Sequence, residues 1–265
     1  MKLLTRKLSL TPNQWNQSPK TAVLLLNMGG PNNAEEVRPY LQELFLDEEI
    51  LKLPVQPLLG RFIAWRRTPA IIKRYEDHLG HYSPTDKWFK LQGAALENKM
   101  DKISPLTAPH KCYSAFRYAE PRTPTVINEL KAEMESIDKI VLFSQYPQHS
   151  CSTSGSSLCD AYRSMKKSLG KEESSKVSVI DNWYSFPGYA ELWTGMIESK
   201  LASLKEEHGY GNEDIHVVYS AHSLPEAYIY EKGDQYANEI QATVDLVHKN
   251  LGEFKHTASD KYGKN

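Results

Sequence analysis

The sequence predicts an α/β fold built on parallel β-sheets. Short apolar and β-branched runs alternate along the chain with amphipathic segments of helical periodicity, as in doubly wound α/β proteins. Polar and aromatic side chains follow several of these runs directly, and open α/β sheets bind ligands at that position. The runs expected to form strands are residues 21–28, 112–118, 140–143, 177–180 and 215–219.

The first expected strand, residues 21–28 (TAVLLLNM), is continuously apolar, which is typical of a parallel strand covered on both faces. Gly29 and Gly30 follow it and permit either a tight turn or a close approach of the backbone to a flat ligand. The motif is not GxGxxG, so we do not predict a dinucleotide site.

The next segment, residues 33–46, has apolar side chains at helical spacing. Residues 50–67 are apolar, are interrupted by prolines and end in arginines. This pattern is compatible with a crossover through the core. It is equally compatible with an exposed apolar segment that touches a bilayer or an apolar ligand. Residues 78–84 are expected to form a turn.

The middle of the chain is expected to hold a helix over residues 88–100 and a strand that ends in Arg117 and Tyr118. Thr123 is expected to cap the following helix, with a proline in its first turn. The strand over residues 140–143 leads into a serine-rich segment, residues 144–157. Such a segment at a helix N-terminus either binds an anion or simply caps the helix.

The last third is expected to contain a helix over residues 188–204, a loop over residues 226–231 and a helix over residues 235–251. His222 lies just past the carboxyl end of the strand at residues 215–219. A lone histidine more often satisfies a backbone carbonyl than binds a ligand. Three other strand ends that carry polar or aromatic groups favour a functional role here.

The composition is typical of a soluble globular protein, with 265 residues, 40% hydrophobic residues and a formal net charge of −1. The near-zero charge argues against a nucleic-acid partner. Three cysteines suggest a reducing compartment rather than a disulfide framework. Residues 1–20 contain lysine and arginine but no acid, which fits either a weak mitochondrial presequence or a disordered tail.

Five ordered motifs together resemble the ferrochelatase family, whose members insert ferrous iron into protoporphyrin IX. They are LNMGGP (26–31), RRTPAI (66–71), FRYAEP (116–121), QYPQHSCSTSGSS (145–157) and SAHSLP (220–225). The resemblance implies two Rossmann-like, chelatase-type domains with parallel sheets, the second of them incomplete. We expect the first domain at residues 21–195, with a membrane-facing lip at residues 50–84, and the partial second domain at residues 196–265.

The resemblance also implies roles for seven residues. His222 would be the catalytic proton acceptor and a ligand of the substrate metal ion. Six residues would contact the porphyrin: Met28, Ser83, Arg117, Tyr118, Tyr146 and Ser152.

Three departures from the family pattern bear on these roles. Residues 80–84 (GHYSP) replace a glycine-rich turn, and Glu120 stands where histidine is common. The family continues well past this point and there supplies an acid opposite the histidine, whereas residues 259–263 resemble only a degraded next motif. The alternative is therefore a catalytically impaired homologue that binds porphyrin or haem.

Cys151 matches the first of four cysteines that hold a [2Fe–2S] cluster in animal ferrochelatases. Because the other three have no counterpart, we expect no cluster and no other bound cofactor in this chain. The resemblance implies protoporphyrin IX and ferrous iron as substrates, peripheral membrane contact through the lip, and a homodimer. It places the protein in mitochondria, on the matrix side of the inner membrane.

Overall fold

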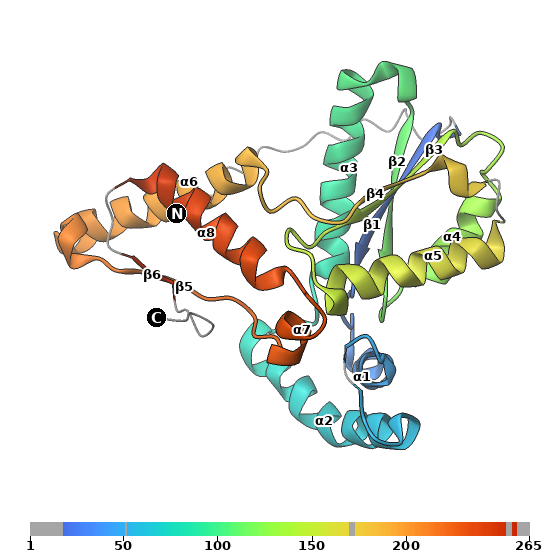
Figure 1. The fold of residues 1–265 in the computed structure, drawn as a ribbon, viewed down its shortest axis with the longest axis horizontal. Coiled ribbons are helices and arrows are strands. Elements are labelled where there is room, and N and C mark those ends of the chain that lie inside the picture. The colour runs from blue at the N-terminus through green and yellow to red at the C-terminus, as the bar shows by residue number, and fades with distance from the viewer. Residues whose placement is uncertain (1–17, 51, 170–172, 253–255, 259–265) are drawn as a thin grey trace.

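The computed structural model describes residues 18–50, 52–169, 173–252 and 256–258, and it contains two parallel sheets (Figure 1). Residues 1–17 of the presequence or tail expected at residues 1–20, and the degraded motif at residues 259–263, lie outside the described residues. A sheet of four strands has the order β2-β1-β3-β4, and a sheet of two strands pairs β5 with β6. The predicted parallel α/β fold is confirmed. The strands are β1 Thr21–Asn27, β2 His110–Phe116, β3 Lys139–Ser144, β4 Val177–Ile180, β5 Val217–Tyr219 and β6 His256–Ala258.

Helices connect the strands along the chain. Their bounds are α1 Ala34–Leu46, α2 Gln56–Leu79, α3 Thr85–Ile103, α4 Thr123–Lys131, α5 Ser156–Ser168, α6 Pro187–His208, α7 Glu226–Tyr230 and α8 Tyr236–Leu251. Short 3₁₀ turns occupy Pro105–Thr107, Glu173–Lys176 and Asn212–Asp214, and a π-helical turn occupies Cys151–Gly155.

β1 lies in the middle of the larger sheet, hydrogen-bonded to β2 on one side and β3 on the other. Its alternate side chains enter two different cores. Leu24 and Leu26 pack with residues of α4 and α5, whereas Val23 and Leu25 pack with Phe89 of α3. α3 covers one face of the sheet and α4 and α5 cover the other (Figure 1). A strand covered on both faces has no position for a polar side chain, which explains the continuous apolar run.

α2 was not foreseen from the proline-interrupted sequence. It runs for 24 residues, with Pro69 inside it. Three apolar residues of α2 are exposed, at 69% for Leu58, 54% for Phe62 and 57% for Trp65, and so is the preceding Val55 at 65%. These exposures favour an exposed apolar segment over a crossover through the core.

Two local predictions were wrong. Arg122, not Thr123, is the N-cap of α4, because the Thr123 hydroxyl donates a hydrogen bond of 3.1 Å to the carbonyl of Phe116 instead. Residues 226–231, expected as a loop, contain the one-turn helix α7.

The two-stranded sheet belongs to a second packing unit. Ala190 of α6 and Val247 and Leu251 of α8 form a buried cluster, against which Tyr219 of β5 packs. The expected domain boundary after residue 195 falls inside α6 and stays a prediction.

We predict that Gly29→Ala destabilises the protein more than Gly80→Ala. Both glycines have positive φ, +76° and +63°, so alanine costs about 1 kcal/mol at either position. A Cβ at Gly29 would also lie 2.7 Å from the Cβ of Ala119 and 2.8 Å from that of Phe116, whereas nothing lies within 4 Å at Gly80. Overpacking should add about 1–3 kcal/mol at Gly29 only. Urea unfolding of both variants measures this difference, and equal losses would contradict it.

Candidate functional site

The carboxyl ends of β1, β2 and β3 meet at one edge of the larger sheet, and four of the predicted site residues lie there. The backbone N–H of Tyr118 donates to the carbonyl of Met28 over 3.1 Å, and that of Arg117 donates to the carbonyl of Asn27 over 2.9 Å. The backbone N–H of Met28 donates to the hydroxyl of Tyr146 over 2.9 Å. Met28, Arg117, Tyr118 and Tyr146 are therefore neighbours.

Tyr146 acts on the backbone of Met28 as a neutral phenol. Burial raises the pKa of Tyr146 to about 12, although the bond from the Met28 N–H acts in the opposite direction. The phenol therefore stays protonated over the physiological range and does not serve as a base. Its hydrogen bond fixes the loop that carries the half-buried Met28 side chain.

Ser83 reaches the same loop from the turn between α2 and α3. Its backbone N–H donates to the carbonyl of Pro31 over 2.9 Å, and its hydroxyl lies 2.8 Å from that of Thr85. A Cβ on Gly30 would collide with the side chain of Ser83, so the small residue is required for this approach. The end of the expected lip thus packs directly on the glycine pair after β1.

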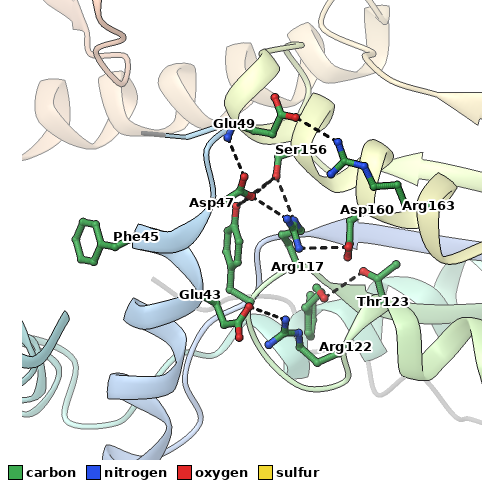
Figure 2. A network of polar contacts seen from close by, with 12 residues as sticks. Glu43, Phe45, Asp47, Glu49, Arg117, Arg122, Thr123, Ser156, Asp160 and Arg163 are labelled. Atoms are coloured by element: carbon green, nitrogen blue, oxygen red, sulfur yellow. Dashed lines mark hydrogen bonds and ion pairs between the residues drawn. The ribbon is translucent and has the colours of Figure 1, made fainter. Parts of the chain in front are cut away.

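Arg117 points at a buried carboxylate, Asp47, which follows α1 (Figure 2). The hydroxyl of Tyr118 binds the same carboxylate. Oδ2 of Asp47 accepts from the Tyr118 hydroxyl at 2.6 Å and from the Ser156 hydroxyl at 2.7 Å, and lies 3.1 Å from Nη2 of Arg117. Burial raises the pKa of Asp47. The hydrogen bonds from Tyr118, Ser156 and the Glu49 N–H, with the charge of Arg117, outweigh burial and hold this pKa below its ordinary value.

A second carboxylate, Asp160 of α5, lies 3.2 Å from Nη1 of Arg117. The side chain of Arg117 therefore bridges two acids, and it is 17% exposed. Burial raises the pKa of Asp160, and Asp47 raises it further, while Arg117 and neighbouring arginines lower it. Two more exposed ion pairs lie near Asp47 and Asp160 (Figure 2). Arg122 is 3.0 Å from Glu43, and Arg163 is 3.6 Å from Glu49.

The sequence analysis did not identify Asp47 or Asp160 as site residues, and it did not predict that Ser156 binds a carboxylate. Asp47 is one of several acids after a helical segment, and nothing in its spacing marks it. Ser156 lay within the serine-rich segment but was not distinguished from its neighbours. Helix α5 begins at Ser156, and the hydroxyl donates to Asp47 instead of binding an external anion.

Ser152 and Cys151 lie in the π-helical turn after β3. The hydroxyl of Ser152 lies 3.0 Å from that of Ser150, and the backbone N–H of Cys151 donates to Oδ2 of Asp234 over 2.8 Å. Burial and the Asp234 carboxylate both raise the pKa of the Cys151 thiol, which disfavours the thiolate that an iron–sulfur cluster requires.

The described part of the chain contains no group of three or more His, Cys, Asp or Glu side chains arranged to hold a metal ion. Cys151 therefore has no set of partners there that fits a [2Fe–2S] cluster. That this chain binds none stays a prediction.

His222 is exposed and lies in the loop after β5, on the smaller sheet. Within the described ranges, no hydrogen bond or ion pair joins its imidazole to Met28, Tyr146 or Asp47. Its backbone N–H faces the Tyr236 phenol at the start of α8. α8 is in turn held to the loop after β3, because Oε2 of Glu239 accepts from the backbone N–H of His149 over 2.6 Å.

We predict that Asp47→Asn destabilises the protein by about 3 kcal/mol at neutral pH, because it removes one of the two carboxylates that Arg117 bridges and leaves this largely buried guanidinium with Asp160 alone of the two. The pKa of Asp47 is lowered from its ordinary value of 3.8. The contribution of the carboxylate is therefore present above that value and is lost as the pH falls through the folded-state pKa. The stability difference from wild type should shrink below pH 3.8.

Glu43→Gln is the matched control, since this exposed carboxylate pairs with Arg122 at 3.0 Å and is 45% exposed. It should cost at most about 1 kcal/mol. Chemical denaturation across pH measures both variants, and a loss at Asp47 that does not change with pH would contradict the assignment.

Comparison with known proteins identifies the chain's relatives. The family described as Ferrochelatase matches residues 20–262. The protein of Bos taurus named "Ferrochelatase, mitochondrial" is 42% identical over 237 residues, which cover 89% of this chain and 55% of that protein. The Drosophila melanogaster protein of the same name is 41% identical over 241 residues, 91% of this chain and 61% of that protein. The Homo sapiens protein is 39% identical over 235 residues, 89% of this chain and 54% of that protein. The chain thus spans somewhat more than half the length of these relatives, and it belongs to the ferrochelatase family.

Proposed function

We propose that this protein inserts ferrous iron into protoporphyrin IX, the last step of haem biosynthesis. The family match over residues 20–262 carries the proposal, because relatives about 40% identical are named ferrochelatases. The gathering of Met28 and Tyr146 at the carboxyl edge of the sheet supports it, since open α/β sheets bind ligands there. We propose the division into domains at residues 21–195 and 196–265 on the same basis.

The proposed chemistry assigns a proton acceptor to the loop after β5. Iron insertion replaces two pyrrole N–H bonds by bonds to the metal, so two protons must leave the macrocycle. An imidazole accepts protons near neutral pH and can also meet a divalent metal ion, and the exposed side chain of His222 is open to both. The half-buried thioether of Met28 is proposed to pack on the porphyrin face.

The other proposed porphyrin neighbours differ in whether their polar groups already bind a carboxylate. Ser83 and Ser152 carry hydroxyls near the loops after β1 and β3. Arg117 and Tyr118 already bind Asp47, so we propose that they shape the base of the porphyrin site rather than react with the substrate.

A second candidate is a protein that binds porphyrin or haem without inserting metal. One observation favours it: among the described residues, no carboxylate forms a hydrogen bond or ion pair with the imidazole of His222. An imidazole without such a partner is a weaker proton relay.

We further propose that α2 contacts a membrane, with the protein on the matrix side of the inner mitochondrial membrane. The relatives are named mitochondrial, and the exposed apolar side chains of α2 adjoin Arg61, Arg66 and Arg67, which suit anionic head groups. None of the helices in the described ranges is long and apolar enough to cross a bilayer. A homodimer is proposed by family analogy alone.

We predict that His222→Ala lowers the initial rate of zinc or iron insertion into protoporphyrin by at least about 100-fold, because it removes the proton acceptor. Porphyrin affinity, measured by fluorescence quenching, should change only severalfold. His208→Ala, at a 50%-exposed histidine at the end of α6, should keep the wild-type rate.

A wild-type rate in His222→Ala would refute the role of this imidazole. If wild type bound porphyrin saturably but inserted no metal, the second candidate would stand instead. If wild type neither bound porphyrin nor inserted metal, both candidates would fail.

We predict that Phe62→Ser with Trp65→Ser lowers binding to anionic phospholipid vesicles by about tenfold or more. The two serines lose the favourable free energy that Phe62 and Trp65 gain when they move from water into the bilayer. Leu106→Ser is the matched control, because Leu106 is 91% exposed but lies away from α2. Co-sedimentation with vesicles measures both. Equal binding of the double variant and wild type would contradict membrane contact through α2.

A further inference from the structure

Tyr228 of α7 makes a contact that joins distant parts of the chain. Its hydroxyl lies 3.1 Å from the carbonyl oxygen of Glu49 and 2.9 Å from that of Ile50. Tyr228 is buried, with 8% of the residue exposed, and its hydroxyl donates to these two partly buried carbonyls. The partners are 179 and 178 residues away in sequence.

The two carbonyls belong to a turn that the buried network holds in place. The backbone N–H of Glu49 donates to Oδ1 of Asp47 over 2.9 Å, and that of Ile50 donates to the carbonyl of Asp47 over 3.1 Å. Asp47 is itself fixed by Arg117 and Tyr118. Tyr228 therefore binds to a rigid point at the carboxyl edge of the larger sheet.

On its other side, Tyr228 is joined to the loop that carries His222. α7 begins directly after Pro225, and the backbone N–H of Tyr228 donates to the carbonyl of Pro225 over 2.9 Å. The carbonyl of Tyr228 accepts from the backbone N–H of Asp234 over 2.9 Å, and Asp234 binds Ser150 at 2.9 Å. In Figure 1, α7 lies between the smaller sheet and the connection from α1 to α2.

We propose that Tyr228 is a positioning residue for His222. This inference rests on the proposed function. A three-residue segment separates the imidazole-bearing residue from α7, and the phenol hydroxyl fixes α7 to the turn at residues 47–50. Without that hydroxyl, the loop at residues 220–225 would lose its connection through α7 to the turn at residues 47–50. The imidazole would then spend less time in the geometry that proton transfer requires.

Tyr228→Phe tests the proposal in the full chain. It removes the hydroxyl but keeps the ring, against which the ammonium of Lys232 lies 3.6 Å from the centroid. Tyr230→Phe is the matched control, because Tyr230 is on the same helix but is 65% exposed. Hydrogen–deuterium exchange is measured by mass spectrometry on all three proteins, with peptides from β1 and β3 reporting that the fold is intact.

We expect Tyr228→Phe to raise exchange about fivefold in peptides covering residues 47–50 and 220–227, as loss of one hydrogen bond predicts. Tyr230→Phe should leave both segments unchanged. In the insertion assay, kcat of Tyr228→Phe should fall about tenfold while KM for porphyrin stays within about twofold, because positioning affects the reactive geometry more than binding.

Unchanged exchange at residues 220–227 in Tyr228→Phe would overturn the inference whatever the activity. If wild type is active, an unaltered kcat would overturn it too, as would a rise in KM with no change in kcat. If wild type inserts no metal, the proposed function fails separately, and exchange at residues 220–227 alone decides whether Tyr228 positions the loop.

Discussion

A single carboxylate, Asp47, holds together the part of the molecule where the candidate site lies. It receives hydrogen bonds from Tyr118 and Ser156 and the charge of Arg117, all at one oxygen. Burying a carboxylate is unfavourable unless donors replace the lost water, and three donors do so here. The arrangement joins the end of α1, the loop after β2 and the start of α5, so these elements cannot move independently.

The position of β1 makes this arrangement possible. Because β1 is the central strand, the loops after β2 and β3 leave the sheet on either side of Met28. Gly29 and Gly30 allow Ala119 and Ser83 to approach the backbone more closely than any side chain would permit. The apolar core of the larger sheet therefore sets the positions of the polar groups at its carboxyl edge. Tyr146 adds a hydrogen bond from the Met28 N–H to its hydroxyl.

The second packing unit is attached to this edge through hydrogen bonds and through aromatic contacts, since the ring of Trp183 packs on Phe143 of β3 and on Tyr189 of α6. Glu239 and Asp234 bind the loop after β3, and Tyr228 binds the turn after α1. These contacts hold the loop of His222 relative to the larger sheet. Carboxylates take part in two of them, and burial raises the pKa of Glu239. The position of His222 relative to Met28 and Tyr146 thus depends on these hydrogen bonds together with the aromatic contacts.

The sequence by itself determined the parallel α/β class, the main strands and the family, because apolar periodicity and ordered motifs are local properties of the chain. It also placed Met28, Arg117, Tyr146 and His222 at strand ends. Only the tertiary structure decided that Arg117 and Tyr118 bind Asp47, which is 71 residues from Tyr118, and that Tyr228 meets the turn 179 residues before it. Such pairings follow from how the elements pack in three dimensions. No local pattern of residues encodes them.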